Sequence, residues 1–149
     1  MNTPFQPVPI ITQFFTGAAN RGLHCGIDLI PQGTGFYRGI SESEKDAQNK
    51  KRLITEITAC IEGKVSYSGW IDGAGLTVAI DSELEEQIIR TIYCHLSEIY
   101  VNIGSTIYEG ETIGRMGNSG CNDIHLHLTF VRNPSGEARF SFSDANLVD

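Results

Sequence analysis

From residue 53 onward, the chain is a succession of short β-type segments separated by turn residues. The segments are rich in β-branched and aromatic residues and are bounded by Gly, Asn, Asp or Pro. They cover residues 53–61, 63–70, 75–81, 87–96, 105–108, 111–117, 123–131 and 138–142. Several short strands with regular turn signals predict an all-β fold, with antiparallel strands in two packed sheets of a barrel-sandwich-like domain.

Length and composition predict one folded domain over residues 1–149. A chain of 149 residues with 40% hydrophobic and 19% charged residues can bury a core of its own. The polar stretch near 36–53, which includes "SESEKDAQNKKR" at 41–52, has little apolar periodicity. We therefore interpret it as a surface insert, either a loop or a short solvated helix. We expect it to form part of a groove wall, although a passive surface loop has the same composition.

Charge and hydropathy exclude two classes of partner. The net charge is −7, and "KKR" at 50–52 is the only cluster of basic residues, which argues against nucleic-acid binding. No run approaches the roughly 18–20 apolar residues of a membrane-spanning helix. The N-terminus has no signal-peptide pattern, which favours delivery by lysis, a phage or a secretion device. A chain that had lost its leader would look the same.

The four cysteines, at positions 25, 60, 94 and 121, lack the C-x-x-C spacing of a structural zinc ribbon. We interpret them as free thiols, although an even number also permits disulfides in an oxidising compartment. Cys94 shares a predicted strand face with Ile92 and Leu96, so we expect it to fill space as a small apolar residue.

The stretch "NDIHLHLTF", residues 122–130, carries two of the four histidines at alternating positions. The period of a strand places Ile124, Leu126, Leu128 and Phe130 on one face, which burial explains. His125 and His127 share the other face with Thr129. They are either packing or surface histidines, or part of a metal or acid–base site, because neutral imidazole is the commonest metal ligand.

Two further motifs carry the remaining histidines. In "HCGID", His24 and Asp28 would lie roughly 13 Å apart on a straight strand, so the segment must bend at Gly26 if both bind one metal. In "YCHLS", His95 shares its predicted strand face with Tyr93, which is either a partner of His95 or a packed sheet residue. Two or three such groups plus a water suffice for a catalytic zinc.

The ordered set "HCGID", "YCHLS" and "HLHL" resembles the lysostaphin-type zinc metallopeptidases, a family of peptidoglycan endopeptidases. The connecting pieces "ITQFFTGAANRGLHCGIDL", "EGKVSYSGW", "GLTVAI" and "VNIGSTIYEGETIGRMGNSG" resemble the family as well. The resemblance spans roughly residues 11–131. The chain departs from the family in its insert, in H-L-H-L for the usual H-L-H-F, and in "GCNDI" where the family often has a small Gly/Thr-rich stretch.

The resemblance implies a role for each of these residues. His24, Asp28 and His127 would bind Zn²⁺, His95 and His125 would be the catalytic pair, and Tyr93 would support His95. The strand pattern alone does not decide which histidine of "HLHL" binds the metal. The implied activity is zinc-dependent hydrolysis of a peptide bond in peptidoglycan stem peptides or cross-bridges, at the bacterial cell wall and in an open groove floored by the sheet.

Two other readings of the sequence remain. A non-catalytic wall-binding or regulatory module on the same fold would be expected to lack one or more ligands, whereas all five positions are kept here. A carrier domain of the biotinyl or lipoyl type would need a lysine at a hairpin tip, and "STIYEGETIGRMGNSG" has none.

Overall fold

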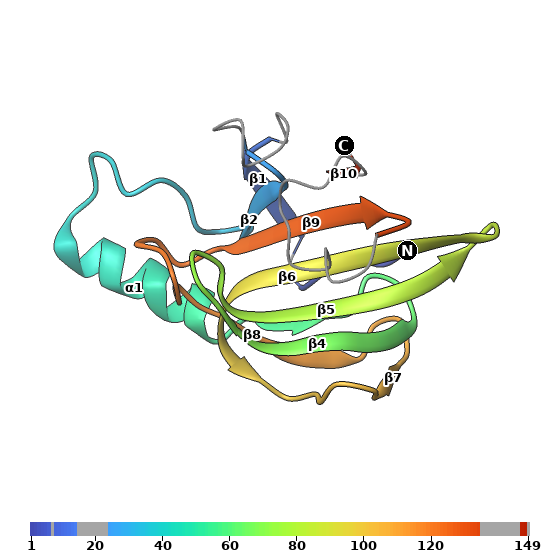
Figure 1. Ribbon diagram of the computed structural model, residues 1–149. Coiled ribbons are helices and arrows are strands. Elements are labelled where there is room, and N and C mark those ends of the chain that lie inside the picture. Colours follow the sequence, from blue (N-terminus) through green and yellow to red (C-terminus); the bar gives the residue numbers. More distant parts are fainter. Residues whose placement is uncertain (7, 15–23, 135–146, 149) are drawn as a thin grey trace.

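The computed structural model describes residues 1–6, 8–14, 24–134 and 147–148, which form a predominantly antiparallel β domain (Figure 1). The strands are β1 (Pro9–Gln13), β2 (Ile27–Pro31), β3 (Glu56–Thr58), β4 (Gly63–Ile71), β5 (Gly75–Leu84), β6 (Gln87–Ile99), β7 (Thr106–Ile107), β8 (Thr112–Met116), β9 (Leu126–Arg132) and β10 (Leu147–Val148). The predicted antiparallel β fold is confirmed. Each predicted segment between residues 53 and 131 contains a strand, and the segment 138–142 lies outside the described residues.

The strands form one branched sheet with the order β1-β2-β9-β6-β5-β4-β7. The first part of β6 pairs with β9, as far as Cys94 opposite His127. The second part pairs with β8, beginning at Leu96 opposite Met116, and β8 in turn pairs with β3. The two expected sheets are therefore branches of one hydrogen-bonded sheet, and the branch point is His95.

A β-bulge at His95 breaks the alternation of side chains along β6. His95 has a positive φ of 63°, which is uncommon for a residue other than glycine. Tyr93 and Leu96, three residues apart, both belong to the main core, whereas Cys94 packs with Ile92 on the opposite face. The prediction that Leu96 shares a face with Cys94 is therefore wrong, because the bulge adds one residue between them.

The main core is enclosed by the sheet and its branch. As predicted from the alternation in β9, Leu126 and Leu128 are buried in it. They pack there with residues from most other strands, including Leu29, Ile57, Val65, Val78, Ile80, Ile107, Ile113 and Met116. This packing leaves the odd-numbered residues of β9 on the opposite face of the sheet.

The polar segment forms the helix α1 (Glu42–Leu53), which confirms the solvated-helix alternative. The side chain of Ser41 caps its N-terminus by accepting a hydrogen bond from the backbone N–H of Glu44 at 3.2 Å. Acidic residues in the first turn and basic residues in the last complement the helix dipole. Figure 1 shows α1 at one end of the sheet, and it contacts β2 and β8.

One residue of α1 is buried despite its charge. Arg52 is only 4% exposed, and its guanidinium donates hydrogen bonds to Thr34 Oγ1, Tyr37 Oη and the backbone oxygens of Gly35 and Ile124. It thereby joins the helix to the loop before it and to the residue that precedes His125. The insert is thus attached to the rest of the domain at its C-terminal end.

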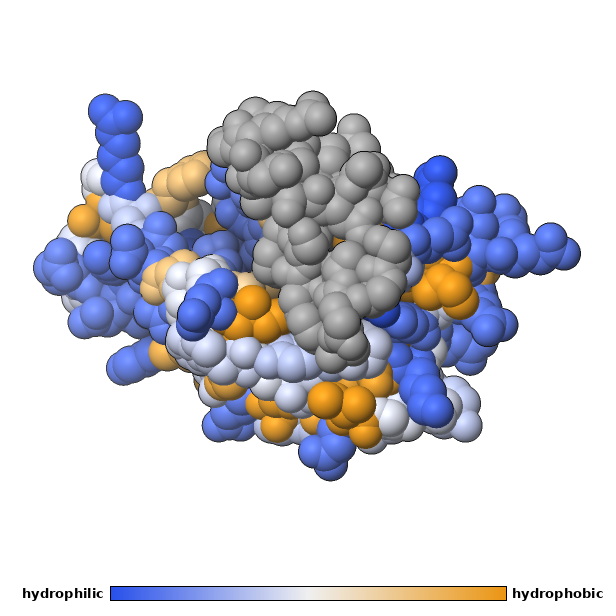
Figure 2. All heavy atoms as spheres, viewed as in Figure 1, coloured by the Kyte–Doolittle hydropathy of each residue, from blue (hydrophilic) through white to orange (hydrophobic). Residues whose placement is uncertain are grey.

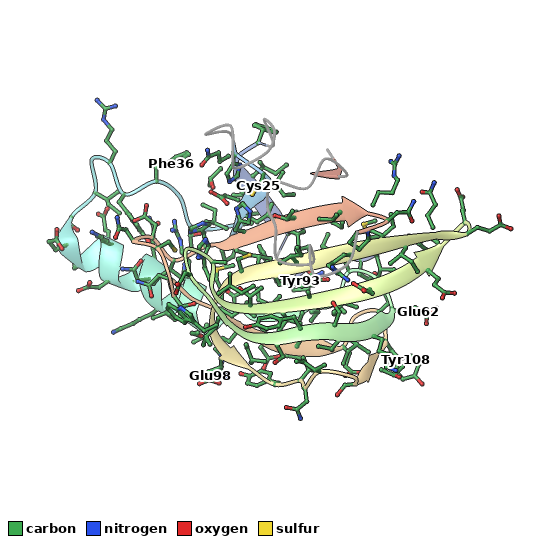
Figure 3. All side chains as sticks on the ribbon, in the orientation of Figure 1. Cys25, Phe36, Glu62, Tyr93, Glu98 and Tyr108 are labelled. Carbon is green, nitrogen blue, oxygen red and sulfur yellow. The ribbon has the colours of Figure 1, made fainter. Side chains whose placement is uncertain are left out.

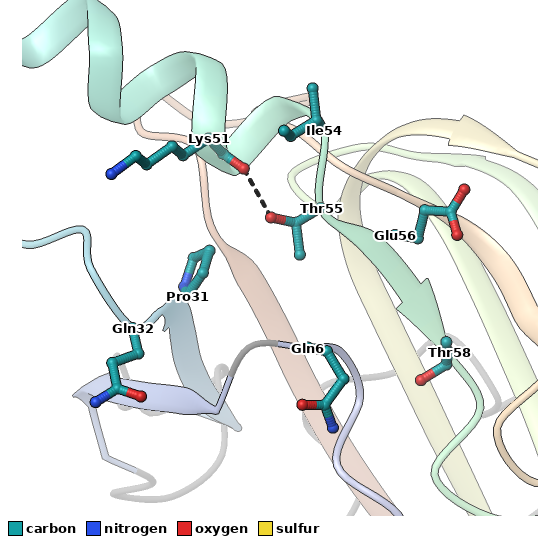
Figure 4. Close-up of a pocket in the computed structure, with 8 residues that line it drawn as sticks. All are labelled: Gln6, Pro31, Gln32, Lys51, Ile54, Thr55, Glu56 and Thr58. Carbon is teal, nitrogen blue, oxygen red and sulfur yellow. Dashed lines mark hydrogen bonds between the residues drawn. The ribbon is translucent and has the colours of Figure 1, made fainter.

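Figure 2 shows hydrophilic residues gathered at both ends of the visible face, with apolar residues in separate spots between them. A hollow of about 670 Å³ lies between the end of α1, β3 and the end of β2, and its lining includes Lys51, Glu56 and Gln32 (Figure 4). No histidine or cysteine lines it.

No helix among the described residues is long and apolar enough to cross a membrane.

Candidate metal centre

Two neighbouring strands bring Asp28 and His127 together. β2 pairs with β9 in a register that places Asp28 directly opposite His127, so their side chains leave the same face of the sheet. The chain bends just before β2, at Gly26, and brings His24 back over this pair. A Cβ atom on Gly26 would lie 2.3 Å from the backbone oxygen of Leu128 and 2.8 Å from His127 Nε2. The glycine is therefore required by this close approach to β9.

The three side chains converge on one point. His24 Nε2 lies 3.1 Å from Asp28 Oδ1 and 3.2 Å from His127 Nδ1. His127 Nδ1 lies 2.9 Å from Asp28 Oδ1. Two donors of a tetrahedral zinc, each about 2 Å from the ion, are about 3.3 Å apart. The donor set and its spacing fit one zinc ion with a fourth position left for water or substrate.

Hydrogen bonds outside this triad orient both imidazoles. His24 Nδ1–H donates to the backbone oxygen of Phe14 at 2.9 Å. His127 Nε2 lies 2.9 Å from Thr129 Oγ1, a hydroxyl that can accept an Nε2–H. The carbonyl of Phe14 thus leaves the lone pair of His24 on Nε2, toward Asp28, and in the tautomer with an Nε2–H toward Thr129, His127 presents the lone pair of Nδ1 in the same way. Sequence reasoning placed Thr129 on the face of His127 but gave it no role. The i, i+2 spacing was the available signal.

Charges at the triad are those that a metal site needs. Burial alone would raise the pKa of Asp28, but hydrogen bonds and charge interactions with His125 and His127 outweigh it and hold this pKa well below its usual range. Burial lowers the pKa of His127, and this effect exceeds the opposing attraction of Asp28. Asp28 is thus an anion and His127 a neutral imidazole, which are the forms that bind metal.

The other two histidines lie beside the triad. The His95 and His125 rings have centroids 4.9 Å apart, and His125 Nε2 lies 3.5 Å from Asp28 Oδ1. His95 Nδ1–H donates to the backbone oxygen of Ser119 at 2.7 Å, and His125 Nδ1–H donates to that of Asp123 at 2.8 Å. Each ring therefore keeps Nε2 for chemistry at the metal centre.

The bulge and the branch point of the sheet place this pair. His95 lies where β9 and β8 diverge from β6. Its backbone N–H donates to the backbone oxygen of Ala74 at 2.8 Å. An isolated bridge between Gly117 and His125 joins the two diverging chains at the same level. All five residues singled out in the sequence thus lie together on one face.

Burial tends to lower the pKa of His125, but hydrogen bonds with Asp28 and Cys121 and the charge of Asp28 outweigh it and raise the pKa to about 10. The neighbours of His125, with Asp28 first among them, thus favour its protonated form.

Tyr93 has a structural role. It is fully buried in the main core, and its hydroxyl accepts a hydrogen bond from the backbone N–H of Cys60 at 2.9 Å (Figure 3). The predicted support of His95 by Tyr93 is wrong, because the bulge turns the two side chains to opposite faces of the sheet. The alternative interpretation, that Tyr93 is a packed residue of the sheet, is correct.

Two hollows flank the metal centre. One of about 250 Å³ is lined by Asp28 and His125 together with Phe36, Tyr37 and Arg52 of the insert. The other, of about 270 Å³, is lined by His95 and His127 with Cys25, Cys94 and the turn at Gly73. The two hollows thus lie on either side of the metal centre, and residues of the insert line the first of them.

Comparison with known proteins gives the family. Peptidase family M23 matches residues 47–138, which is more than half of the chain. The chain therefore belongs to peptidase family M23, a family of hydrolases of the metallopeptidase class that degrade peptidoglycan. No curated protein matches.

Solved structures show the same fold at low sequence identity. The catalytic domain of the antimicrobial peptidase lysostaphin from Staphylococcus simulans is 20% identical with a TM-score of 0.65, and the match covers 95% of this chain and 88% of that one. LytU is 23% identical with a TM-score of 0.63, over 100% of this chain and 86% of that one. A zinc-containing peptidase from Vibrio cholerae is 20% identical with a TM-score of 0.65, over 98% of this chain and 40% of that one.

Proposed function

We propose that this chain is a zinc-dependent endopeptidase that hydrolyses a peptide bond in the stem peptides or cross-bridges of bacterial peptidoglycan, acting at the cell wall as a single domain over residues 1–149. The observation that carries the proposal is the convergence of His24, Asp28 and His127 within 3.2 Å of one another, with two further imidazoles beside them. A merely structural zinc site would have four protein ligands and no catalytic neighbours.

His24, Asp28 and His127 would hold the zinc ion. When bound, the ion would supply Lewis acidity toward the scissile carbonyl and the attacking water. It would also offset the negative charge of Asp28, and this lowers the proton affinity of His125. The remaining chemistry belongs to the two other histidines.

His125 is the proposed general base. Its Nδ1–H is held by the oxygen of Asp123 at 2.8 Å, so its Nε2 can take a proton from the attacking water and pass it to the leaving amine. His95 is the proposed partner of the oxyanion. Because the oxygen of Ser119 takes the Nδ1–H of His95, Nε2 donates to the oxyanion only when this ring is protonated.

The groove suits an extended peptide of small residues. It would include the two hollows beside the metal centre, which are of about 250 and 270 Å³. With a net charge of −7, the protein gains nothing from attraction to anionic wall polymers, so binding must come from the groove itself. Wall cross-bridges rich in glycine and D-alanine fit these requirements.

Substitution of Asp28, His127 and His125, one at a time, separates the metal-binding residues from the catalytic ones. We expect elemental analysis to find one zinc per chain in the parent protein and in His125→Ala, but none in Asp28→Ala or His127→Ala. All three variants should fail to release new amino termini from isolated sacculi. Zinc lost from His125→Ala and kept in His127→Ala would reverse the assignment. Release of reducing sugars without amino termini by the parent protein would contradict peptide-bond cleavage.

A further inference from the structure

A second group of metal-binding side chains lies next to the first. One ligand atom each from His95, Cys121 and His125 lies within 4.8 Å of the others. None of these three residues belongs to the triad of His24, Asp28 and His127. Cys121 lies in "GCNDI", where the chain departs from the family pattern.

One loop builds this group. Residues 117–125 connect β8 to β9, and the backbone oxygens of Ser119 and Asp123 in this loop hold His95 Nδ1 and His125 Nδ1 at 2.7 and 2.8 Å. The same loop carries Cys121, whose Sγ lies 4.0 Å from His125 Nδ1 and donates to the oxygen of Asp123 at 3.2 Å. The loop thus organises both imidazoles and places a thiol beside them.

Cys121 differs from the other three cysteines in its accessibility. It is half-buried, whereas Cys25, Cys60 and Cys94 are buried. Cysteine binds metal as the thiolate, so binding at this site releases the proton of Cys121. Cys121 is therefore the thiol that an added metal ion can reach beside the two imidazoles.

The donors are of the right kind and nearly at the right spacing. Two imidazoles and a thiolate favour Zn²⁺ and softer ions such as Cd²⁺ over Mg²⁺ or Ca²⁺. In a tetrahedral site with bonds of about 2.0 Å to nitrogen and 2.3 Å to sulfur, donors lie roughly 3.3–3.6 Å apart. The 4.0 Å between Cys121 Sγ and His125 Nδ1, and the 4.8 Å within which all three ligand atoms lie, exceed this spacing by roughly 0.5–1.5 Å, so the side chains would move together on binding. Water can supply a fourth ligand.

We propose that His95, Cys121 and His125 form a second, thiolate-containing metal site, and that a metal ion bound there inhibits hydrolysis because it occupies both catalytic imidazoles. The metal site itself follows from the three side chains. The inhibition rests on the catalytic roles given to His95 and His125 under the proposed function.

Cadmium binding tests the site without reference to activity. Protein carrying one equivalent of zinc is titrated with Cd²⁺, and thiolate-to-metal charge-transfer absorption is recorded in the ultraviolet. We expect one equivalent of Cd²⁺ to bind with this absorption in the parent protein and in the matched control Cys60→Ala, whose thiol lies in the core. Cys121→Ser should lose the absorption and keep its zinc.

A variant without the first site keeps this test independent of the proposed function. Asp28→Asn should bind one equivalent of Cd²⁺ with the same absorption, because its second site is intact. Absorption that survives Cys121→Ser but disappears in Cys25→Ser would place the ion at the first centre, where Cys25 Sγ lies 3.7 Å from His127 Nε2, and would overturn the proposal. Absence of the absorption in the parent protein would overturn it as well.

Inhibition is measured on isolated sacculi. Excess Zn²⁺ should reduce the release of amino termini by the parent protein at least tenfold more strongly than by Cys121→Ser. Equal inhibition of the two proteins, with cadmium binding as predicted, would refute the inhibitory role and leave the metal site in place.

Discussion

Replacement of Thr129 by valine would remove one hydroxyl group from the metal centre and leave the shape of the side chain nearly unchanged. Thr129 is fully buried and His127 is only 8% exposed, so water cannot replace the hydroxyl. Thr129 Oγ1 lies 2.9 Å from His127 Nε2, and as the acceptor of an Nε2–H it would keep the lone pair of this ring on Nδ1, toward Asp28. The sulfur of Cys25, 3.7 Å from Nε2, is a weaker acceptor.

The expected loss is in zinc affinity. Hydrogen-bond partners of metal-binding histidines typically contribute about 10- to 100-fold to metal affinity. This factor corresponds to about 1.4–2.7 kcal/mol of binding free energy. Thr129→Val should therefore weaken zinc binding by about this factor, whereas Thr129→Ser, which keeps the hydroxyl, should bind zinc nearly as tightly as the parent protein.

Competition with a chromophoric chelator at neutral pH measures the zinc affinity of the three proteins. Denaturation with a chelator present separates any change in the stability of the metal-free fold from the change in affinity. Parent-like affinity of Thr129→Val would refute the role of this hydrogen bond. An equal loss in Thr129→Ser would show that packing, and not the hydroxyl, matters.

Two further predictions concern groups beside the site. Arg52→Met removes the guanidinium donor from the buried oxygen of Ile124 and the half-buried oxygen of Gly35, so it should lower the free energy of unfolding by about 2–4 kcal/mol. Arg52→Lys should restore little of this because lysine lacks the planar fork of donors. A thermal melt of Arg52→Met identical to that of the parent protein would contradict this. Alkylation of Cys121 by iodoacetamide should rise with a midpoint near pH 7, since the imidazoles lower its pKa to about 7 and favour the thiolate above that pH. His125→Ala should move the midpoint upward, and an unchanged midpoint would exclude His125 as the cause.

The composition of the segments and their period determined much of the fold and of the candidate site. β-branched residues between turn residues located most strands, because these preferences are local along the chain. The alternation in "HLHL" placed His125 and His127 on the face opposite Leu126 and Leu128, as the structure has them. The resemblance in the three motifs named the five polar residues that the fold brings together.

Pairing between distant segments decided the rest. His95 reaches the metal centre because β6 exchanges β9 for β8 at a bulge, and this bulge also sends Tyr93 into the core. No local pattern in "IIRTIYCHL" marks the bulge, since it depends on the register of three strands. The burial of Arg52 likewise depends on distant segments, because its guanidinium binds the backbone oxygens of Gly35 and Ile124.

The hydrogen bond from His127 to Thr129 and the position of Cys121 beside two imidazoles likewise needed the assembled structure. Cys121 is 26 residues from His95 in the sequence, yet the two belong to one cluster of ligand atoms. Sequence determines which side chains are available and, through local periodicity, which face of its own strand each occupies. Only the tertiary structure brings those faces together, because distances between segments are set by sheet register and core packing.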